Sequence, residues 1–332
     1  MNRKVFLTLV KITVVTAAVV WLRGRVDMAS VGRVLAAAHV WYLVLAVVLY
    51  WLPVCIAGFR WHILLKTLSI ALPLRALVCV THIGQFFTIL LPGVAGDDGT
   101  RFYYISRLAP GRVRQACSTV LLDRILGFAS LFILTTICIP INWRVLEAQR
   151  ATRWVGVGFL TAGVLMLTAS TVFLACKKAH LERLFAKIQT VSGRFSFITE
   201  LVEVASAFAG NRRRLCLVCA SALVTQVLIC CAFWSAGCAV DIHLPLWAWM
   251  SFVPVILVAG VLPITFAGIG VRDYLLFLFL GSVAPVAAGA DQITALSLLM
   301  LLCTLLLSGI GGLVYMVYKP ASKIASVAAV VP

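Results

Sequence analysis

The sequence predicts an all-α integral membrane protein with several transmembrane helices, on the evidence of its composition and its long apolar runs. Of the 332 residues, 63% are apolar and 12% are charged. A soluble domain carries roughly 25% charged and about half apolar residues. So much apolar surface cannot be buried in one soluble body of this size, and we expect it to face lipid.

Six apolar runs reach the roughly 20 residues that a helix needs to cross the hydrocarbon core. Tryptophan and tyrosine cluster toward their ends, where amphipathic rings favour the membrane interface. The first run resembles a signal peptide, but it contains Lys11 and lacks a clear cleavage site, so we expect an uncleaved helix. The six runs are Val5–Leu22, Val40–Leu65, Gln115–Asn142, Trp154–Cys176, Leu215–Val240 and Ile293–Tyr318.

Two further runs predict broken, re-entrant helices. Ala76–Gly96 and Ile242–Val271 each end in a segment rich in proline and glycine. A short apolar piece follows each of them, Phe102–Leu108 or Tyr274–Gly281. Irregular backbone is tolerated at membrane depth only where protein buries it or where it lines a wet cavity. We therefore expect about six full spans and two re-entrant hairpins, eight apolar segments in all.

The two broken segments share a pattern that predicts an internal repeat. In both, a Leu-Pro pair is followed at one spacing by a glycine, Gly99 or Gly270, and then by an arginine, Arg101 or Arg272. If the first hairpin enters from the cytoplasm, the intervening spans bring the second in from outside. That arrangement is an inverted-topology repeat, which places a binding site near the membrane midplane.

The charge distribution predicts the topology and excludes one class of partner. A net charge of +17 would suggest nucleic acid binding in a soluble protein. Here the basic residues stand in short loops, as expected for contacts with an anionic cytoplasmic leaflet, so we expect no nucleic acid partner. We expect a multi-pass inner-membrane protein with both termini cytoplasmic. A single domain over 1–332 would contain repeat halves at 40–142 and 213–318 and an amphipathic cytoplasmic connector at 177–212.

The broken segments supply the main candidate binding residues. Glycine lets the backbone approach a ligand closely, and free amides at the start of a helix favour an anion. We expect Arg101 and Arg272 to bind the phosphate of a lipid head group, assisted by amides near Gly99 and Gly270. The alternative is that proline and glycine only kink packed helices and that both arginines extend to the interface.

Other ionisable residues inside the apolar runs extend this site. Asp123 and Arg124 lie about 12 Å into their span, where charges are costly and need partners. Asp98 and Asp123 could orient the arginines or accept an amine, although a purely structural buried pair is the alternative. His82 could relay protons or simply pack. The secondary candidates are Arg60, His82, Gln85, Asp97 and Asp273.

The sequence gives little support for metal or cofactor chemistry. Asp97 and Asp98 suggest a carboxylate pair, but no histidine or further acid converges on their segment. Cys216 and Cys219 have C-x-x-C spacing inside an apolar span, where packing is the simpler explanation. We expect no metal and no cofactor.

Four motifs occur in order along the chain. They are Arg60-Trp61, the segment from Gly84-Gln85-Phe86-Phe87-Thr88 through Leu91-Pro92 to Arg107, Asp123-Arg124-Ile125-Leu126-Gly127, and Leu262-Pro263 through Gly270 to Arg272. Together they resemble the transmembrane, flippase-like region of the lysylphosphatidylglycerol synthase family. The chain departs from that pattern at Asp97, where the family usually has glycine, and at Asp273, where it has glutamate.

The resemblance implies lipid translocation. In full-length family members this region moves lysyl-phosphatidylglycerol outward, while a soluble C-terminal domain transfers lysine from aminoacyl-tRNA. Because the chain stops at Pro332, we expect no such domain and no enzymatic step. We expect flipping of an anionic or aminoacylated phospholipid or related lipid, with a second copy or a lipid-modifying enzyme as a candidate partner. The alternatives are a membrane-embedded transferase acting on a polyprenyl or phospholipid substrate, with Asp97 and Asp98 as its catalytic pair, and a small-anion transporter.

Overall fold

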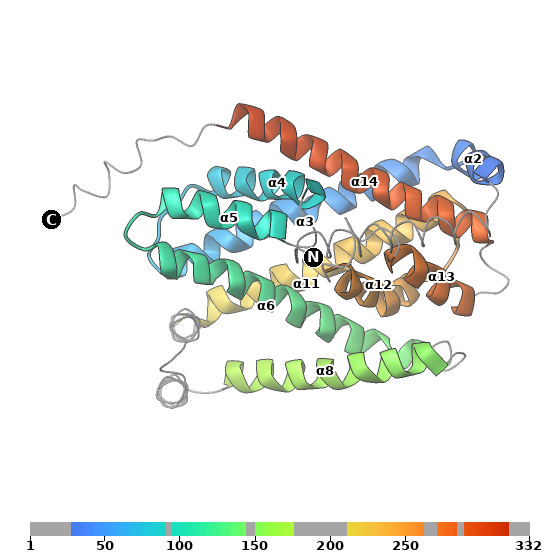
Figure 1. The fold of residues 1–332 in the computed structure, drawn as a ribbon. Helices are drawn as coiled ribbons and strands as arrows, with labels where there is room; N and C mark the ends of the chain where they lie inside the picture. Colours follow the sequence, from blue (N-terminus) through green and yellow to red (C-terminus); the bar gives the residue numbers. More distant parts are fainter. Residues whose placement is uncertain are drawn as a thin grey trace, which may run out of the picture.

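The computed structural model describes residues 28–90, 95–143, 150–175, 211–261, 271–283 and 289–318, and every element in these ranges is helical (Figure 1). This confirms the all-α fold class. The elements are α2 (Met28–Ala36), α3 (Val40–Thr67), α4 (Leu74–Leu90), α5 (Ala95–Leu108), α6 (Val113–Cys138), η1 (Pro140–Asn142), α8 (Arg150–Ala175), α11 (Arg212–Ala239), α12 (Leu246–Val261), α13 (Val271–Val283) and α14 (Ala290–Val317).

Four of the described helices, α3, α6, α11 and α14, are long and apolar enough to cross a membrane. Their 26 to 28 residues give lengths of about 40 Å. The chain is therefore a multi-pass membrane protein. In α8, the described apolar stretch is the shorter Arg153–Thr168. The predicted span Val5–Leu22 lies outside the described residues, as does all of the predicted connector but its last two residues.

Two pairs of short helices occupy opposite ends of the bundle (Figure 1). Helices α4 and α5, of 17 and 14 residues, pack together at the end where α3 finishes and α6 begins. Helices α12 and α13, of 16 and 13 residues, lie toward the other end. Each helix stops or starts beside a Pro- and Gly-containing segment, 91–94 or 262–270, that lies outside the described residues. The inverted repeat stays a prediction.

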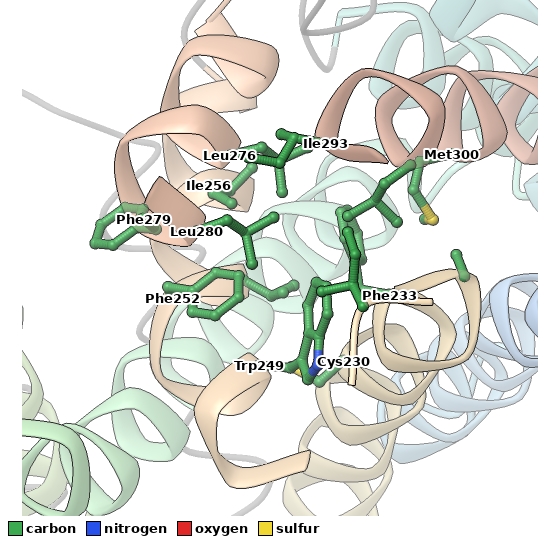
Figure 2. Close-up of a cluster of buried hydrophobic side chains, with 14 of the residues drawn as sticks. Cys230, Phe233, Trp249, Phe252, Ile256, Leu276, Phe279, Leu280, Ile293 and Met300 are labelled. Atoms are coloured by element: carbon green, nitrogen blue, oxygen red, sulfur yellow. The ribbon is translucent and has the colours of Figure 1, made fainter. Parts of the chain in front are cut away.

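An apolar core joins α11, α12, α13 and α14 (Figure 2). Trp249 and Phe252 of α12 pack near Phe233 of α11, and the rings of Phe252 and Phe279 stack with centroids 5.8 Å apart. Helix α12 is apolar on all sides, which is typical of a helix surrounded by protein or lipid. This half of the bundle is therefore held by apolar packing.

Helix α2 is an element that the apolar runs do not predict. It has only nine residues, too few for a span, and it packs against α14. Val31 is buried while Arg33 is exposed, so the helix buries one face only. A short amphipathic helix of this kind leaves too weak a pattern to stand out beside spans of 28 residues.

Glycines in α14 bring that helix into backbone contact with α4. A Cβ atom on Gly311 would overlap the carbonyl oxygen of His82, and one on Gly312 would stand 3.1 Å from the ring of Phe86. Small residues are the usual means by which membrane helices approach closely. Gly311 thus fixes α4, and the hairpin that α4 forms with α5, against the long span α14.

We expect Gly311→Ala to destabilise the protein by about 1–3 kcal/mol, because the added methyl group overlaps backbone that cannot swing away. Gly309→Ala on the same helix is the control, since a Cβ there meets no atom within 4 Å. Thermal unfolding of the purified proteins in detergent measures the difference. Equal midpoints for the two variants would contradict the close packing of α14 on α4.

Candidate functional site

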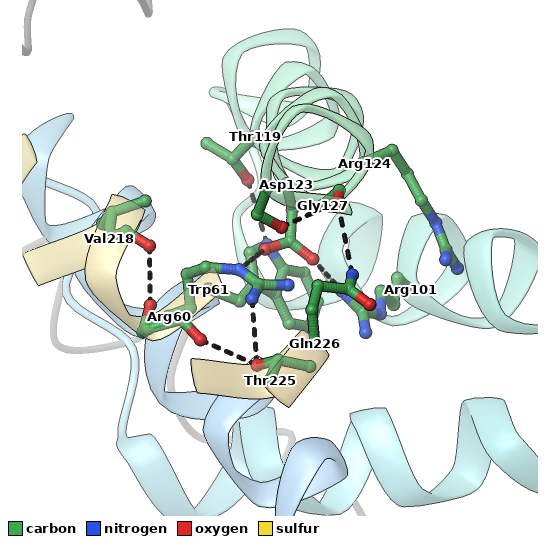
Figure 3. Close-up of polar contacts among 12 residues, drawn as sticks. Arg60, Trp61, Arg101, Thr119, Asp123, Arg124, Gly127, Val218, Thr225 and Gln226 are labelled. Carbon is green, nitrogen blue, oxygen red and sulfur yellow. Dashed lines mark hydrogen bonds and ion pairs between the residues drawn. The ribbon is translucent and has the colours of Figure 1, made fainter. Parts of the chain in front are cut away.

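Six charged side chains from α3, α5 and α6 form an alternating chain of ion pairs, which we call the ion chain (Figure 3 shows part of it). Each acid lies between or beside arginines, and three positive groups meet three negative ones. Burying charges costs least when each has a close partner of opposite sign. The ion chain runs in the order Arg60, Asp123, Arg101, Asp97, Arg124 and Asp98.

The inner half of the ion chain is centred on Asp123. One carboxylate oxygen accepts a hydrogen bond from Nε of Arg60 at 2.5 Å, and the other accepts one from Nη1 of Arg101 at 3.0 Å. Arg60 also donates through Nη1 to Oγ1 of Thr225 on α11 at 3.4 Å. The side chains of Asp123, Arg101 and Arg60 are only 4%, 3% and 6% exposed. Both oxygens of Asp123 therefore neutralise buried guanidinium groups.

The outer half of the ion chain is more accessible. Asp97 accepts hydrogen bonds from Nε of Arg101 at 3.0 Å and from Nη2 of Arg124 at 2.5 Å. Nε of Arg124 donates to Asp98 at 2.8 Å. The side chain of Arg124 is 29% exposed and that of Asp98 is 19% exposed. The ion chain thus leads from a sealed interior to an accessible edge.

Local sequence explains how these groups meet. Asp97 and Arg101 stand one turn apart on α5, a spacing that pairs side chains along a helix. Helix α4 makes room for Asp97 through Gly84. A Cβ atom at that position would overlap the Asp97 carboxylate. On the other side, the Arg101 guanidinium lies 5.4 Å from the ring centroid of Trp61, a cation–π contact. Nε1 of Trp61 donates to Thr119 of α6 at 3.0 Å, which fixes the ring.

A cavity of about 270 Å³ borders the ion chain. Charged groups line one part of it, namely Arg60, Asp97, Arg101, Asp123 and Arg124. The remaining lining includes the uncharged polar residues Tyr50, Gln85, Thr225 and Gln226, the glycine Gly127, and the apolar residues Pro53, Val54, Ala57, Phe128, Leu131, Ile229, Leu257 and Leu307. The cavity is therefore amphipathic, with charged side chains on one part and hydrocarbon on another.

The motifs do not predict the contribution of α11. Gln226 is 8% exposed and lines the cavity, and its Nε2 donates to the carbonyl oxygen of Gly127 at 3.3 Å. Its Oε1 is buried and has no partner among the described residues. The feature of the sequence that could have predicted this role is the consecutive polar pair Thr225-Gln226 in the middle of an apolar span. Polar groups at that depth are costly and face the protein interior.

Three other predicted residues have different surroundings. Nε2 of His82 accepts a hydrogen bond from Trp51 at 3.0 Å, and Nδ1 lies 2.8 Å from the carbonyl oxygen of Val78, so contacts occupy both nitrogens. Gln85, one turn along α4, lines the cavity. Gly99 is exposed on α5, and a Cβ there would meet no atom within 4 Å.

The second-half residues form a separate cluster between α13 and α14. Nη2 of Arg272 donates to the carbonyl oxygen of Ser297 at 3.1 Å, and its Nε lies 3.5 Å from Asp273. Asp273 accepts a hydrogen bond from the Ser297 hydroxyl. Neither Arg272 nor Asp273 is among the described residues that line the cavity, and Gly270 lies outside the described residues.

The structure thus brings Arg101, Asp123 and Arg124 together with Arg60 and Asp97 around one cavity. The family model described as "Lysylphosphatidylglycerol synthase TM region" matches residues 8–312. The chain belongs to this family. A comparison with curated proteins found no match.

Membership in the lysylphosphatidylglycerol synthase TM region family confirms the resemblance read from the four motifs. Family membership supports a role in membrane lipid biology for this membrane domain. The matched range contains every residue of the ion chain and Gln226.

Proposed function

We propose that this lysylphosphatidylglycerol synthase TM region protein translocates an anionic or aminoacylated phospholipid, or a related lipid, across the cytoplasmic membrane. The observation that carries the proposal is the amphipathic cavity beside the ion chain, set among helices long enough to span a bilayer. A lipid head group crossing the membrane needs polar partners in an otherwise apolar path. Ionisable groups held at that depth are typical of substrate pathways.

The accessible end of the ion chain suits a phosphate. Arg124 binds Asp97 and Asp98 through Nη2 and Nε, and its Nη1 has no hydrogen-bond partner among the described residues. Arg124 lines the cavity, so this remaining donor can bind a phosphate oxygen in a charge-assisted hydrogen bond. Carboxylate partners keep the arginines neutralised when no lipid is bound. Asp98, at the accessible end, can accept an amine of an aminoacylated head group.

The arrangement of short helices supports a transport cycle. Helices α4 and α5 pack at one end of the bundle, and α12 and α13 lie toward the other (Figure 1). We propose that the two pairs are inverted repeats that open the cavity alternately to the two sides, as in other transporters built from broken helices. Leu257 of α12 lines the cavity together with residues of α3 and α6, so both halves of the chain contribute to it.

A cavity-filling variant tests the proposed function. A Cβ on Gly127 would meet no atom within 4 Å and Gly127 lines the cavity, so we expect the side chain of Gly127→Leu to occupy part of the cavity. In phosphatidylcholine vesicles with traces of acyl-labelled phosphatidylglycerol, we expect the wild type to move the label between leaflets. We expect Gly127→Leu to slow this movement about tenfold or more, since a penalty of 1.4 kcal/mol already gives that factor.

Gly158→Leu on α8 is the matched control, because a Cβ there also meets no atom within 4 Å and the residue lies outside the cavity. Lipid movement by the wild type no faster than in protein-free vesicles, or unchanged in Gly127→Leu at equal protein content, would refute the proposal. Inhibition by soluble glycerol phosphate combined with uptake of that anion would indicate a small-anion transporter instead.

A further inference from the structure

A basic surface covers the end of the bundle where α3 finishes and α6 begins (Figure 1). Its residues come from the turn between α3 and α4, the turn between α5 and α6, and the start of α11. Hydrogen bonds join these parts, because Nη1 of Arg112 donates to the carbonyl oxygen of Leu68 at 3.1 Å and Nη1 of Arg214 donates to that of Lys66 at 3.4 Å. Besides Lys66, Arg112 and Arg214, the basic surface contains the exposed residues Arg75, Arg107, Arg212 and Arg213.

The two ends of the bundle differ in charge. Of the acidic residues that the structure describes, three belong to the ion chain and one lies between α13 and α14. The other two, Asp241 and Asp291, lie at the end opposite the basic surface, where they accompany the exposed Arg33 and Arg153. Charges at that end therefore balance within the described ranges, whereas the basic surface has no described acid to neutralise it.

The neighbours of the basic surface are apolar and aromatic side chains that face outward. On α5, the guanidinium group of Arg107 lies 4.6 Å from the ring centroid of Tyr103, which is 52% exposed. On α11, Arg213 stands one turn before Leu217, which is 47% exposed. Outward-facing apolar side chains on spanning helices meet lipid, and tyrosine favours the interface. We therefore expect the basic groups one turn beyond the hydrocarbon, at the level of the lipid phosphates.

We propose that the basic surface binds anionic phospholipid head groups of the leaflet at this end of the bundle. Each Lys or Arg near an anionic membrane surface enriches anionic lipid by about fivefold. Arg60 of the ion chain lies about 10 Å further in along α3, so the basic surface is separate from the cavity. The bound lipids hold this end at the membrane surface. The proposal concerns the lipid around the protein and is independent of which lipid the cavity accepts.

Cys216 offers a local reporter for this lipid. It lies one turn after Arg212 on α11 and is exposed, whereas the other described cysteines are buried or half-buried. Cys176 lies outside the described residues and is replaced by serine. A bimane group on Cys216 is then quenched by any brominated lipid that contacts it. The vesicles are phosphatidylcholine with a minor fraction of phosphatidylglycerol, and one of the two lipids is brominated at a time.

We expect phosphatidylglycerol beside the wild-type reporter at about five times its bulk fraction in low salt. In 1 M salt the enrichment should vanish, because the screening length falls to about 3 Å. Arg212→Gln combined with Arg213→Gln removes two exposed charges beside the reporter and should lower the enrichment to less than about twofold. Quenching by brominated phosphatidylcholine in the absence of phosphatidylglycerol should be equal in both proteins, which shows that the variant is folded and lies at the same depth.

Arg33→Gln combined with Arg153→Gln is the matched control, since it removes the same charge from two exposed residues at the other end. It should keep the enrichment, as should Gly127→Leu, which acts on the cavity. No enrichment in the wild type, enrichment that survives in Arg212→Gln/Arg213→Gln, or its loss in the control would each overturn the proposal. Displacement of the lipid by added RNA would assign the basic surface to nucleic acid instead.

Discussion

Replacing Asp123 with alanine is expected to destabilise the protein by about 3–5 kcal/mol, the usual cost of breaking a buried ion pair from one side. Asp123 is 4% exposed and pairs with two arginines, Arg60 and Arg101, whose side chains are similarly buried. Its loss leaves both guanidinium groups without their shared carboxylate. Within the described ranges, Arg101 keeps a second acid, Asp97, and Arg60 keeps none. Chemical unfolding in detergent, followed by tryptophan fluorescence, measures the change.

Asp98→Ala provides an internal comparison from the other end of the ion chain. Among the described residues Asp98 forms an ion pair with Arg124 alone, and both side chains are partly exposed. Arg124 also keeps its contact with Asp97, so we expect a clearly smaller loss of stability than for Asp123→Ala. Equal losses for the two variants would show that burial and the number of partners do not govern the ion chain.

Gly84→Ala should be nearly as damaging although it removes no charge. The new methyl group would overlap the Asp97 carboxylate and lie 3.2 Å from the Cα atom of that residue. Asp97 must then shift away from both Arg101 and Arg124. Overpacking alone costs about 1–3 kcal/mol, and disturbing buried ion pairs raises the expected loss to about 3–5 kcal/mol.

A double-mutant cycle tests the cause of that loss. In an Asp97→Gly background the overlapping carboxylate is absent, so Gly84→Ala should cost less than in the wild type. Gly281→Ala on α13 is the control for alanine at a helical glycine, since a Cβ there meets no atom within 4 Å. An equal cost of Gly84→Ala in both backgrounds would rule out the overlap with Asp97 as its cause.

The sequence predicts most of the long helices because a helix needs about 20 apolar residues to cross the hydrocarbon core of a membrane. The runs Val40–Leu65, Leu215–Val240 and Ile293–Tyr318 correspond to α3, α11 and α14 within a few residues at each end. Helices α4 and α12 end where the sequence reaches a Leu-Pro pair, at the position that the broken-helix prediction requires. Helix α2 has only nine residues, so a search for apolar runs of spanning length cannot predict it.

The candidate site was only partly predictable, because spacing along one helix does not reveal which helices face each other. The depth of Asp123 in its span predicts that this carboxylate needs a charged partner, and the motifs offer Arg101 as one of the arginines that it could orient. That Arg60 would share this carboxylate depends on how α3 and α6 are rotated. Arg101 and Arg272 occupy equivalent places in the sequence pattern, yet the first meets acids of two helices and the second meets Ser297.

The ion chain also limits which helices could move in the proposed transport cycle. It fastens α3, α5 and α6 to one another through buried contacts that are costly to separate, so these helices behave as one rigid body. The side chain that α12 contributes to the cavity, Leu257, is apolar, so it forms no ion pair that would resist movement of α12. If the protein transports lipid as proposed, we therefore expect α12 to move against the charged half of the bundle, to which the close packing at Gly311 also holds α14.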